Sequence, residues 1–194
     1  MALPIRSDSS RYTYADLFTW PEDGRWELID GIPYDMSPSP TLTHERIGMA
    51  LIKQFSDYLD GHTCELFSAP FDVRLPKPGQ DGMTADTVVQ PDLFVVCEPD
   101  KLDEHGCVGA PSLVIEIISP STMCKDLREK YVVYQRAGVP EYWIIDPKKK
   151  TLQIHTLDET GSYGTPIVYL AGESAPVSVL PGLEIDLTRI FAER

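Results

Sequence analysis

Two opposite charges, Glu116 and Lys130, lie in the most regular apolar part of this 194-residue sequence, where charges need a physical reason. Glu116 interrupts the apolar run 113–118, which predicts a strand that is covered on both faces of a sheet. A carboxylate in such a strand must be paired, protonated or bound to a cation, because its desolvation is otherwise costly. The first question is therefore what Glu116 meets.

The segment that follows, 125–137, predicts a helix whose inner face carries the second charge. At about 100° per residue, one face collects five residues, namely Leu127, Lys130, Tyr131, Tyr134 and Ala137. The opposite face collects Arg128, Glu129, Gln135 and Arg136. We therefore expect Lys130 to point inward and to meet Glu116. Taken alone, this pair fits a structural ion pair and a functional site equally well.

Two further carboxylates could join this pair. Asp92 follows Pro91 near the start of a predicted strand, and Glu27 lies on the first of two short strands that flank the hairpin signal Asp30-Gly31. Singly, Asp92 is most simply a strand-start turn residue and Glu27 an edge-strand carboxylate. Together, carboxylates beside a lysine suit Mg²⁺ or Mn²⁺ and a phosphate substrate, with the amine positioning water or offsetting charge.

The other elements must bring these residues together. The segment 41–59 predicts a helix whose apolar face includes His44, for which a core or capping histidine is the alternative. Short strands with turns between them are predicted at 152–157, 166–170, 177–180 and 183–185, and a final amphipathic turn at 187–191. Strands and helices intermixed around one core predict a single α/β domain over 12–194, preceded by a flexible tail over 1–11.

The charge balance limits the partners. A net charge of −13 argues against a protein that coats nucleic acid non-specifically. The basic run Lys148-Lys149-Lys150 is most simply a solvated turn, with a phosphate contact as the alternative. No apolar run approaches the roughly 20 residues that cross a bilayer, so no membrane partner is expected.

The number and spacing of the cysteines bear on the redox state of the cellular compartment. Four of them, Cys64, Cys97, Cys107 and Cys124, are scattered without zinc-ligand spacing. This pattern predicts reduced, mostly buried thiols and a cytoplasmic protein.

Several stretches resemble the Uma-two family of restriction endonucleases, within the PD-(D/E)xK nuclease superfamily. They are PD at 91–92, VIEIISPST at 114–122, DLREKYVVYQRAGVPEYWIIDP at 126–147 and the earlier WELIDG at 26–31. The resemblance covers about residues 12–190 and implies a restriction endonuclease-like core, in which helices flank a mixed central β-sheet and C-terminal strands are added. The superfamily usually places its lysine two residues after the acid, which here is Ile118. The resemblance implies that Lys130 substitutes for it.

The same resemblance implies roles. Asp92, Glu116 and Glu27 would hold Mg²⁺ or Mn²⁺, Lys130 would act as base or orient water, and His44 would lie near the substrate phosphate. The predicted function is a metal-dependent endonuclease that hydrolyses DNA phosphodiester bonds through a localised contact. The alternative is a nuclease-fold protein that does not cut and serves as a binding or assembly module. A homodimer is expected only because twofold symmetry is common.

Overall fold

The computed structural model describes residues 11–20, 24–36, 40–119 and 125–192, with side chains described from 128 onward in the last range. Apart from Arg11, the predicted tail 1–11 lies outside these residues, as do positions 120–122 of the family-like stretch. Within the described ranges, no helix combines the length and the apolar character that crossing a membrane requires.

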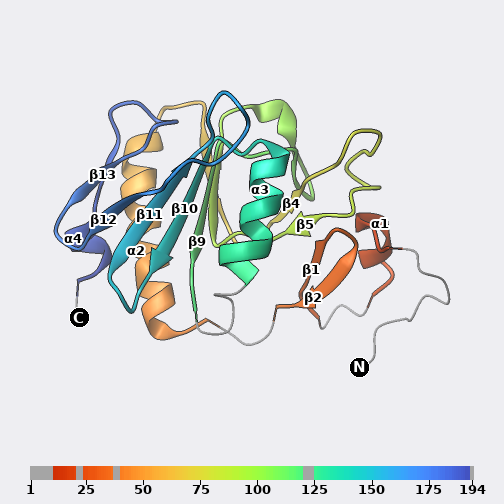
Figure 1. The fold of residues 1–194 in the computed structure, drawn as a ribbon, viewed down its shortest axis with the longest axis horizontal. Coiled ribbons are helices and arrows are strands. Elements are labelled where there is room, and N and C mark those ends of the chain that lie inside the picture. Colours follow the sequence, from red (N-terminus) through yellow and green to blue (C-terminus); the bar gives the residue numbers. More distant parts are fainter. Residues whose placement is uncertain (1–10, 21–23, 37–39, 120–124, 193–194) are drawn as a thin grey trace.

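A six-stranded mixed sheet, here called the central sheet, forms the middle of the fold (Figure 1). In spatial order its strands are β12 (Ile167–Leu170), β11 (Thr151–Thr156), β10 (Glu141–Asp146), β9 (Leu113–Ile117), β6 (Leu93–Val96) and β3 (Glu65–Ser68). Strands β9 and β10 are parallel, and the other neighbours are antiparallel. All five residues of β9 are buried, as its unbroken apolar pattern predicts.

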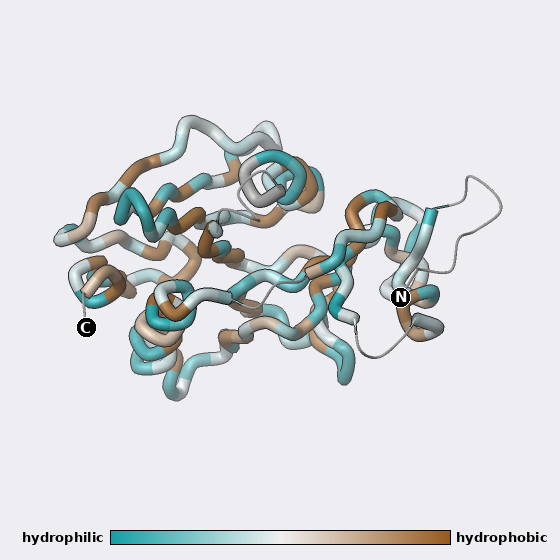
Figure 2. The backbone as a smooth tube through the Cα atoms, turned by 90° about the horizontal axis from the view of Figure 1, so that it is seen from below, coloured by the Kyte–Doolittle hydropathy of each residue, from teal (hydrophilic) through white to brown (hydrophobic). Residues whose placement is uncertain are grey.

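Two helices cover the two faces of the central sheet (Figures 1 and 2). Helix α2 (Leu42–Leu59) begins after Thr41, whose hydroxyl accepts the His44 amide, and it packs Ile47, Leu51 and Phe55 on one face. Helix α3 (Tyr131–Ala137) follows a π-helical turn (Lys125–Lys130) and packs on the other face. The predicted helix 41–59 is thus confirmed to within one residue.

A second six-stranded sheet continues from the α3 side of the molecule (Figure 1). In spatial order its strands are β2 (Ile32–Asp35), β1 (Trp26–Ile29), β5 (Val88–Val89), β4 (Asp72–Arg74), β8 (Gly106–Val108) and β7 (Leu102–Asp103). Ile29, Val73 and Val89 of this sheet share a core cluster with Val114 of β9 and Tyr134 of α3. This shared core fixes β1 against the helix that carries Lys130.

The remaining elements are short: α1 (Tyr14–Leu17), the 3₁₀ turn Pro99–Lys101, β13 (Ser174–Pro176), β14 (Glu184–Asp186) and α4 (Leu187–Ile190). The predicted mixed α/β architecture is confirmed, although the strands divide between two large sheets. The strand predicted at 177–180 is wrong. This segment is a turn in which Leu180 N donates to Val177 O. Val177 and Leu180 are buried in the α2-side core, and Val179 packs against it.

The prediction of reduced thiols is wrong for two cysteines. Cys64 and Cys97 form a disulfide, whereas Cys107 is free and buried and Cys124 lies outside the described residues. Cys64 immediately precedes β3 and Cys97 immediately follows β6, and these antiparallel strands pair Glu65 with Val96. The next pair of the register is therefore the two cysteines, a match that only strand pairing reveals.

The predicted hairpin at Asp30-Gly31 is confirmed, with φ of 51° and 76° at the two residues. Asp30 also ties this hairpin to its surroundings, because its Oδ1 lies 2.6 Å from Arg136 Nη2 of α3 and 2.7 Å from Lys77 Nζ. The strand bearing Glu27 and the helix next to Lys130 are thus joined by an ion pair as well as by the shared core.

Replacing Asp30 by Asn is expected to remove an acid-sensitive part of the stability. Hydrogen bonding from Arg136 above all, and from Lys77, lowers the pKa of Asp30 to about 2. A carboxyl whose folded-state pKa is depressed stabilises the fold above its unfolded value, and this contribution disappears as the pH falls from about 4 to about 2. Urea unfolding at a series of pH values should therefore show wild type and Asp30→Asn converging in this window.

The control is Asp57→Asn on α2, which breaks an exposed pair with Lys53 at 3.6 Å. That change should cost less than about 1 kcal/mol. Equal losses for both variants across all pH values would contradict a special role for Asp30.

Candidate functional site

Lys130 lies between two buried glutamates. Its Nζ is 2.9 Å from Glu27 Oε1 and 2.7 Å from Glu116 Oε1. Glu27 is 0% exposed, Glu116 3% and Lys130 1%. The three side chains come from β1, β9 and the start of α3, so three distant stretches of chain meet at one ammonium group. Two carboxylates can remain buried here because the lysine between them offsets their charge.

Two further groups hold the glutamates in place. The Tyr134 hydroxyl donates to Glu116 Oε1 at 2.8 Å, and the backbone amide of Gln90 donates to Glu27 Oε1 at 2.9 Å. Burial first, and then the charge of Glu116, raises the pKa of Tyr134 well above its ordinary value. The tyrosine is therefore a permanent neutral donor to Glu116.

Replacing Tyr134 by Phe should lower the free energy of unfolding by about 1 to 3 kcal/mol, because a buried carboxylate loses a donor. The matched control is Tyr58→Phe, whose hydroxyl bonds the Pro181 carbonyl near the surface at 2.9 Å and should cost less. Denaturant unfolding of both variants measures the difference. Equal losses would mean that the Glu116 contact has no special weight.

Asp92 immediately precedes β6, the strand that pairs with the Glu116 strand β9. Strand β6 pairs Leu93 with Ile115 of β9, so the register continued by one residue sets Asp92 opposite Glu116. Asp92 Oδ2 accepts the Ile117 amide at 2.7 Å and lies 3.1 Å from His44 Nε2. The side chains of Asp92 and His44 are 23% and 17% exposed, so this pair is more open to solvent than the glutamate–lysine group.

The structure therefore arranges the five predicted site residues as two adjoining groups. Glu27 and Glu116 both contact Lys130, and Asp92 contacts His44. The link between them is β9 itself, since Asp92 is bonded to the backbone of the residue that follows Glu116. The helical projection of Lys130 onto the inner face is confirmed, as is the placement of His44 on the covered side of its helix.

The donor set fits a hard divalent cation in chemical type, because all three carboxylates offer oxygen ligands. In the part of the chain that the structure describes, no group of three or more His, Cys, Asp or Glu side chains is arranged as a metal site. Lys130 lies between the two glutamates, and Asp92 lies beside them on the more exposed side. A metal role for Asp92, Glu116 and Glu27 accordingly stays a prediction.

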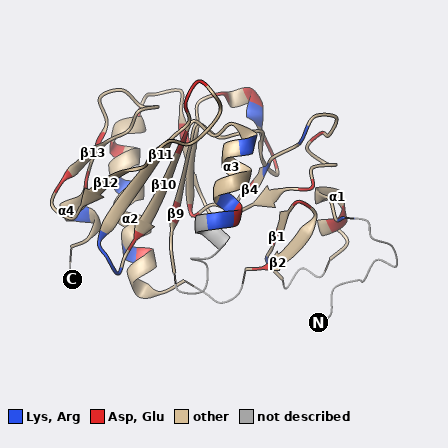
Figure 3. Cartoon of the chain, viewed as in Figure 1, with Lys and Arg blue, Asp and Glu red and all other residues tan. Residues whose placement is uncertain are grey.

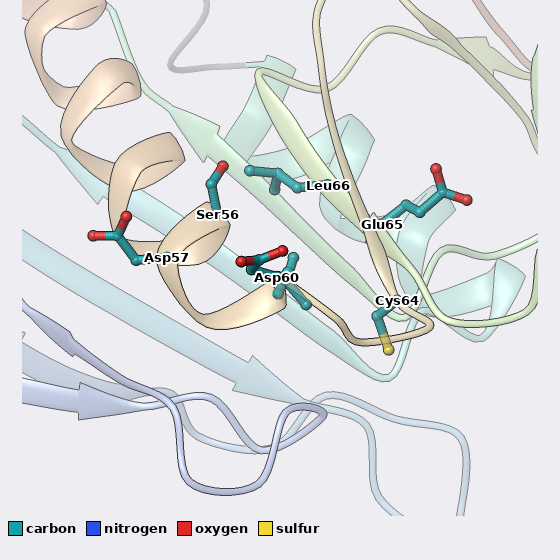
Figure 4. Close-up of a pocket in the computed structure, with 7 residues that line it drawn as sticks. Ser56, Asp57, Asp60, Cys64, Glu65 and Leu66 are labelled. Carbon is teal, nitrogen blue, oxygen red and sulfur yellow. The ribbon is translucent and has the colours of Figure 1, made fainter.

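One cavity among the described residues lies apart from these two groups. It has a volume of about 670 Å³ and is lined by Ser56, Asp57, Leu59, Asp60, Cys64, Glu65 and Leu66 (Figure 4). It borders the last turn of α2, whereas His44 lies in the first turn, about 18 Å away along a helix with a rise of 1.5 Å per residue. The candidate site is therefore not this cavity.

Sequence reasoning assigned no role to three of the contacts. Tyr134 was expected on the inner helix face, and its spacing of four residues from Lys130 is the signal that it could join the site. The backbone amides of Gln90 and Ile117 hold carboxylates but leave no trace in the residue types. They become visible only once the strand register is known.

Comparisons with known proteins agree with this architecture. A crystal structure described as "a putative nuclease belonging to DUF820" from Anabaena variabilis ATCC 29413 superposes with a TM-score of 0.72 at 19% identity, covering 93% of this chain and 97% of that one. At this identity the likeness establishes the fold alone. A relative in Synechocystis sp. (strain ATCC 27184 / PCC 6803 / Kazusa), the uncharacterized protein slr1290, is 24% identical over 138 residues, 71% of this chain and 68% of its own length.

The family comparison covers nearly the whole chain. Residues 14–188 match the model of the Uma2 family, which is described as "Putative restriction endonuclease". This span includes both groups of the candidate site and both large sheets. The chain belongs to the Uma2 family.

Proposed function

We propose that this protein is a divalent-metal-dependent endonuclease that hydrolyses phosphodiester bonds of DNA. The observation that carries the proposal is the meeting of Glu27, Glu116 and Lys130 at one buried point beside Asp92. Membership of a family described as restriction endonucleases supports the same reaction class. A twofold dimer is part of the proposal, since cutting both strands of a duplex calls for two sites. The cytoplasmic location predicted from reduced thiols loses that support, because Cys64 and Cys97 form a disulfide.

The residues supply distinct parts of the chemistry. Lys130 is a fixed positive charge, which would orient the attacking water and offset the charge that develops on the phosphate. Glu27 and Glu116 hold the ammonium group of Lys130 between them, each at hydrogen-bond distance. Because the ammonium group is buried and lies between two carboxylates that Tyr134 and Gln90 hold in turn, it needs little rearrangement when the substrate arrives.

Asp92 and His44 face the more exposed side of the site. The imidazole Nε2 of His44 is 3.1 Å from Asp92 Oδ2, so this carboxylate can hold the ring in one orientation. The other nitrogen of this ring, Nδ1, lies 4.0 Å from Glu45 Oε1, so the proposed contact of His44 with a substrate phosphate rests on the family resemblance. The Ile117 amide in turn fixes Asp92 to the end of β9.

A bound Mg²⁺ or Mn²⁺ would lower the pKa of a water ligand and neutralise phosphate charge. Asp92 and Glu116 are the residues that would hold it, with Glu27 as a further ligand, directly or through water. Their all-oxygen character is what these two ions prefer.

One observation favours a second candidate, a nuclease-fold binding or assembly module that does not cut. Both glutamates are already engaged by Lys130, as in a structural ion pair. The net charge of −13 also disfavours a broad nucleic-acid surface. Activity measurements separate the two candidates.

The test is nicking of supercoiled plasmid by purified protein with Mg²⁺, with Mn²⁺ and with a chelator. The proposal expects nicking that depends on the metal and that Glu116→Gln abolishes while the protein stays folded. Glutamine keeps the size of the side chain and an acceptor for Tyr134, but it removes the charge.

The matched control is Glu141→Gln on the neighbouring strand β10. Glu141 is also buried, accepts from Trp143 Nε1 at 2.6 Å, and has its pKa raised by burial. Its replacement should leave nicking intact per folded molecule. Wild-type protein that never nicks, in any metal, would favour the non-cutting module.

A further inference from the structure

The lysine run Lys148-Lys149-Lys150 forms the turn between β10 and β11, and all three residues are exposed. The turn has a fixed shape. The buried side chain of Asp146 accepts the Lys148 and Lys149 amides at 3.0 Å each, and Lys150 adopts a left-handed φ of 53°. The turn therefore presents three exposed lysines on a fixed backbone, and Lys149 Nζ lies 3.4 Å from Asp146 Oδ2. Asp146 itself is the turn residue that its position before Pro147 indicates.

The same edge of the central sheet carries the candidate site (Figure 3). Strands β9 and β10 run parallel and pair Ile117 with Ile145, so both end on one side of the sheet. Asp92 borders β9 from the other neighbouring strand, β6. Asp92 is level with Ile144 in the register, so two strand spacings of about 4.8 Å set the lysine turn about 10 Å to the side of Asp92, and the four residues from Ile144 to Lys148 set it up to about 13 Å further along the strand direction.

The distance from the lysine turn to Asp92 can be compared with the spacing of phosphates along a nucleic-acid strand. Phosphates of one strand of a duplex follow one another at about 3.4 Å along the helix axis, so the combined separation of about 16 Å spans roughly five of them. Charges beyond about 8 to 10 Å are largely screened at physiological ionic strength. A duplex held at this edge is therefore governed by the nearby lysines more than by the overall charge of −13.

We infer that the Lys148–Lys150 turn contacts backbone phosphates of a duplex nucleic acid a few nucleotides from the bond that is cut. This inference rests on the proposed function and adds to it the surface that holds the substrate. The lysines would bind without regard to sequence, because phosphate contacts position a duplex but do not distinguish its bases. They are placed to set where along the backbone the site acts.

The experiment compares two charge-matched double variants. Lys148→Gln combined with Lys149→Gln removes two cations from the turn. Lys53→Gln combined with Arg189→Gln removes two exposed cations that lie on α2 and α4, where each is paired with an aspartate. Affinity for a 20-base-pair duplex is measured in chelator, to prevent cutting, over a range of salt concentrations.

The turn variant should bind more weakly, and its plot of log affinity against log salt should be shallower by about 0.9 per lost phosphate contact, or about 1.8 in all. The control variant should keep the wild-type slope. A turn variant whose slope equals that of the control would overturn the inference, as would a wild type that does not bind the duplex. Plasmid nicking by the wild type is scored separately. If the wild type nicks plasmid but the turn variant keeps the wild-type salt slope, only this inference is refuted. If the turn variant has a shallower slope but the wild type does not nick, only the proposed activity is refuted.

Discussion

Replacement of Lys130 by Met is expected to lower the free energy of unfolding by about 3 to 5 kcal/mol, the usual cost of breaking a buried ion pair from one side. The lysine is within 2.9 Å of both Glu27 and Glu116. Methionine fills much of the same volume, but it leaves two buried carboxylates facing each other without a cation. Most of the loss is therefore electrostatic, and it should shrink at acid pH as the carboxylates take up protons.

A triple variant isolates this electrostatic part. Lys130→Met combined with Glu27→Gln and Glu116→Gln removes all three charges and keeps the shapes. Replacing a whole buried charged group by neutral residues is often neutral or stabilising, so the triple variant should regain most of the lost stability. Denaturant unfolding measures both proteins. A triple variant that is less stable than Lys130→Met alone would show that packing, and not charge, determines the effect.

Stability and catalysis should separate in these variants. The triple variant is expected to fold and yet to nick no plasmid, because it lacks the ammonium group and two acids. If it retained wild-type nicking, the glutamate–lysine group would be structural only.

Replacement of Asp92 by Asn should reduce plasmid nicking by about 100-fold or more, since the site loses a carboxylate that would hold the metal ion. Asparagine keeps an oxygen that can accept the Ile117 amide, so the fold should change little. Mn²⁺ should raise the melting temperature of the wild type, because a ligand that binds only the folded state stabilises it, and this rise should be lost in the variant.

The control for this change lies on the adjacent strand. Asp146 also ends a strand of the central sheet and also accepts backbone amides, but at the β10–β11 turn. Asp146→Asn should leave the response to Mn²⁺ as in the wild type, because Asp146 shapes the lysine turn and is not a proposed metal ligand. Equal nicking by wild type and Asp92→Asn would remove Asp92 from the proposed chemistry.

The contact between Glu116 and Lys130 could be predicted from the sequence because both of its determinants are local. A covered strand must satisfy its one charge, and helical periodicity assigns Lys130 to the inner face. The π-helical turn before α3 did not upset this assignment, because the chain winds as an α-helix from Tyr131 onward and keeps Tyr134 above Lys130.

Contacts that depend on strand order could not be predicted in the same way. The disulfide between Cys64 and Cys97 and the backbone amide donors to Glu27 and Asp92 all follow from which strands are neighbours and in which register. Alternation within one strand says which face a residue takes, but not what lies across from it. Register therefore had to come from the folded chain.

Local patterns also misled where tertiary packing dominates. The apolar residues of 177–180 suggest a strand, yet Val177 and Leu180 are buried from a turn against the α2-side core. The hydrophobicity of these residues indicates that they are buried. A turn that packs over a helix and a sheet can bury them as well as a strand can.

The central claim is that Asp92 and the glutamate–lysine group form one metal-dependent site. Its most direct test is a crystal structure of the protein soaked in Mn²⁺, with an anomalous difference map to locate the ion. The account predicts a peak bound by carboxylate oxygens of Asp92 and Glu116, with Lys130 beside it. A map with the ion bound elsewhere, or with none at this edge of β9 under conditions that support nicking, would contradict the account.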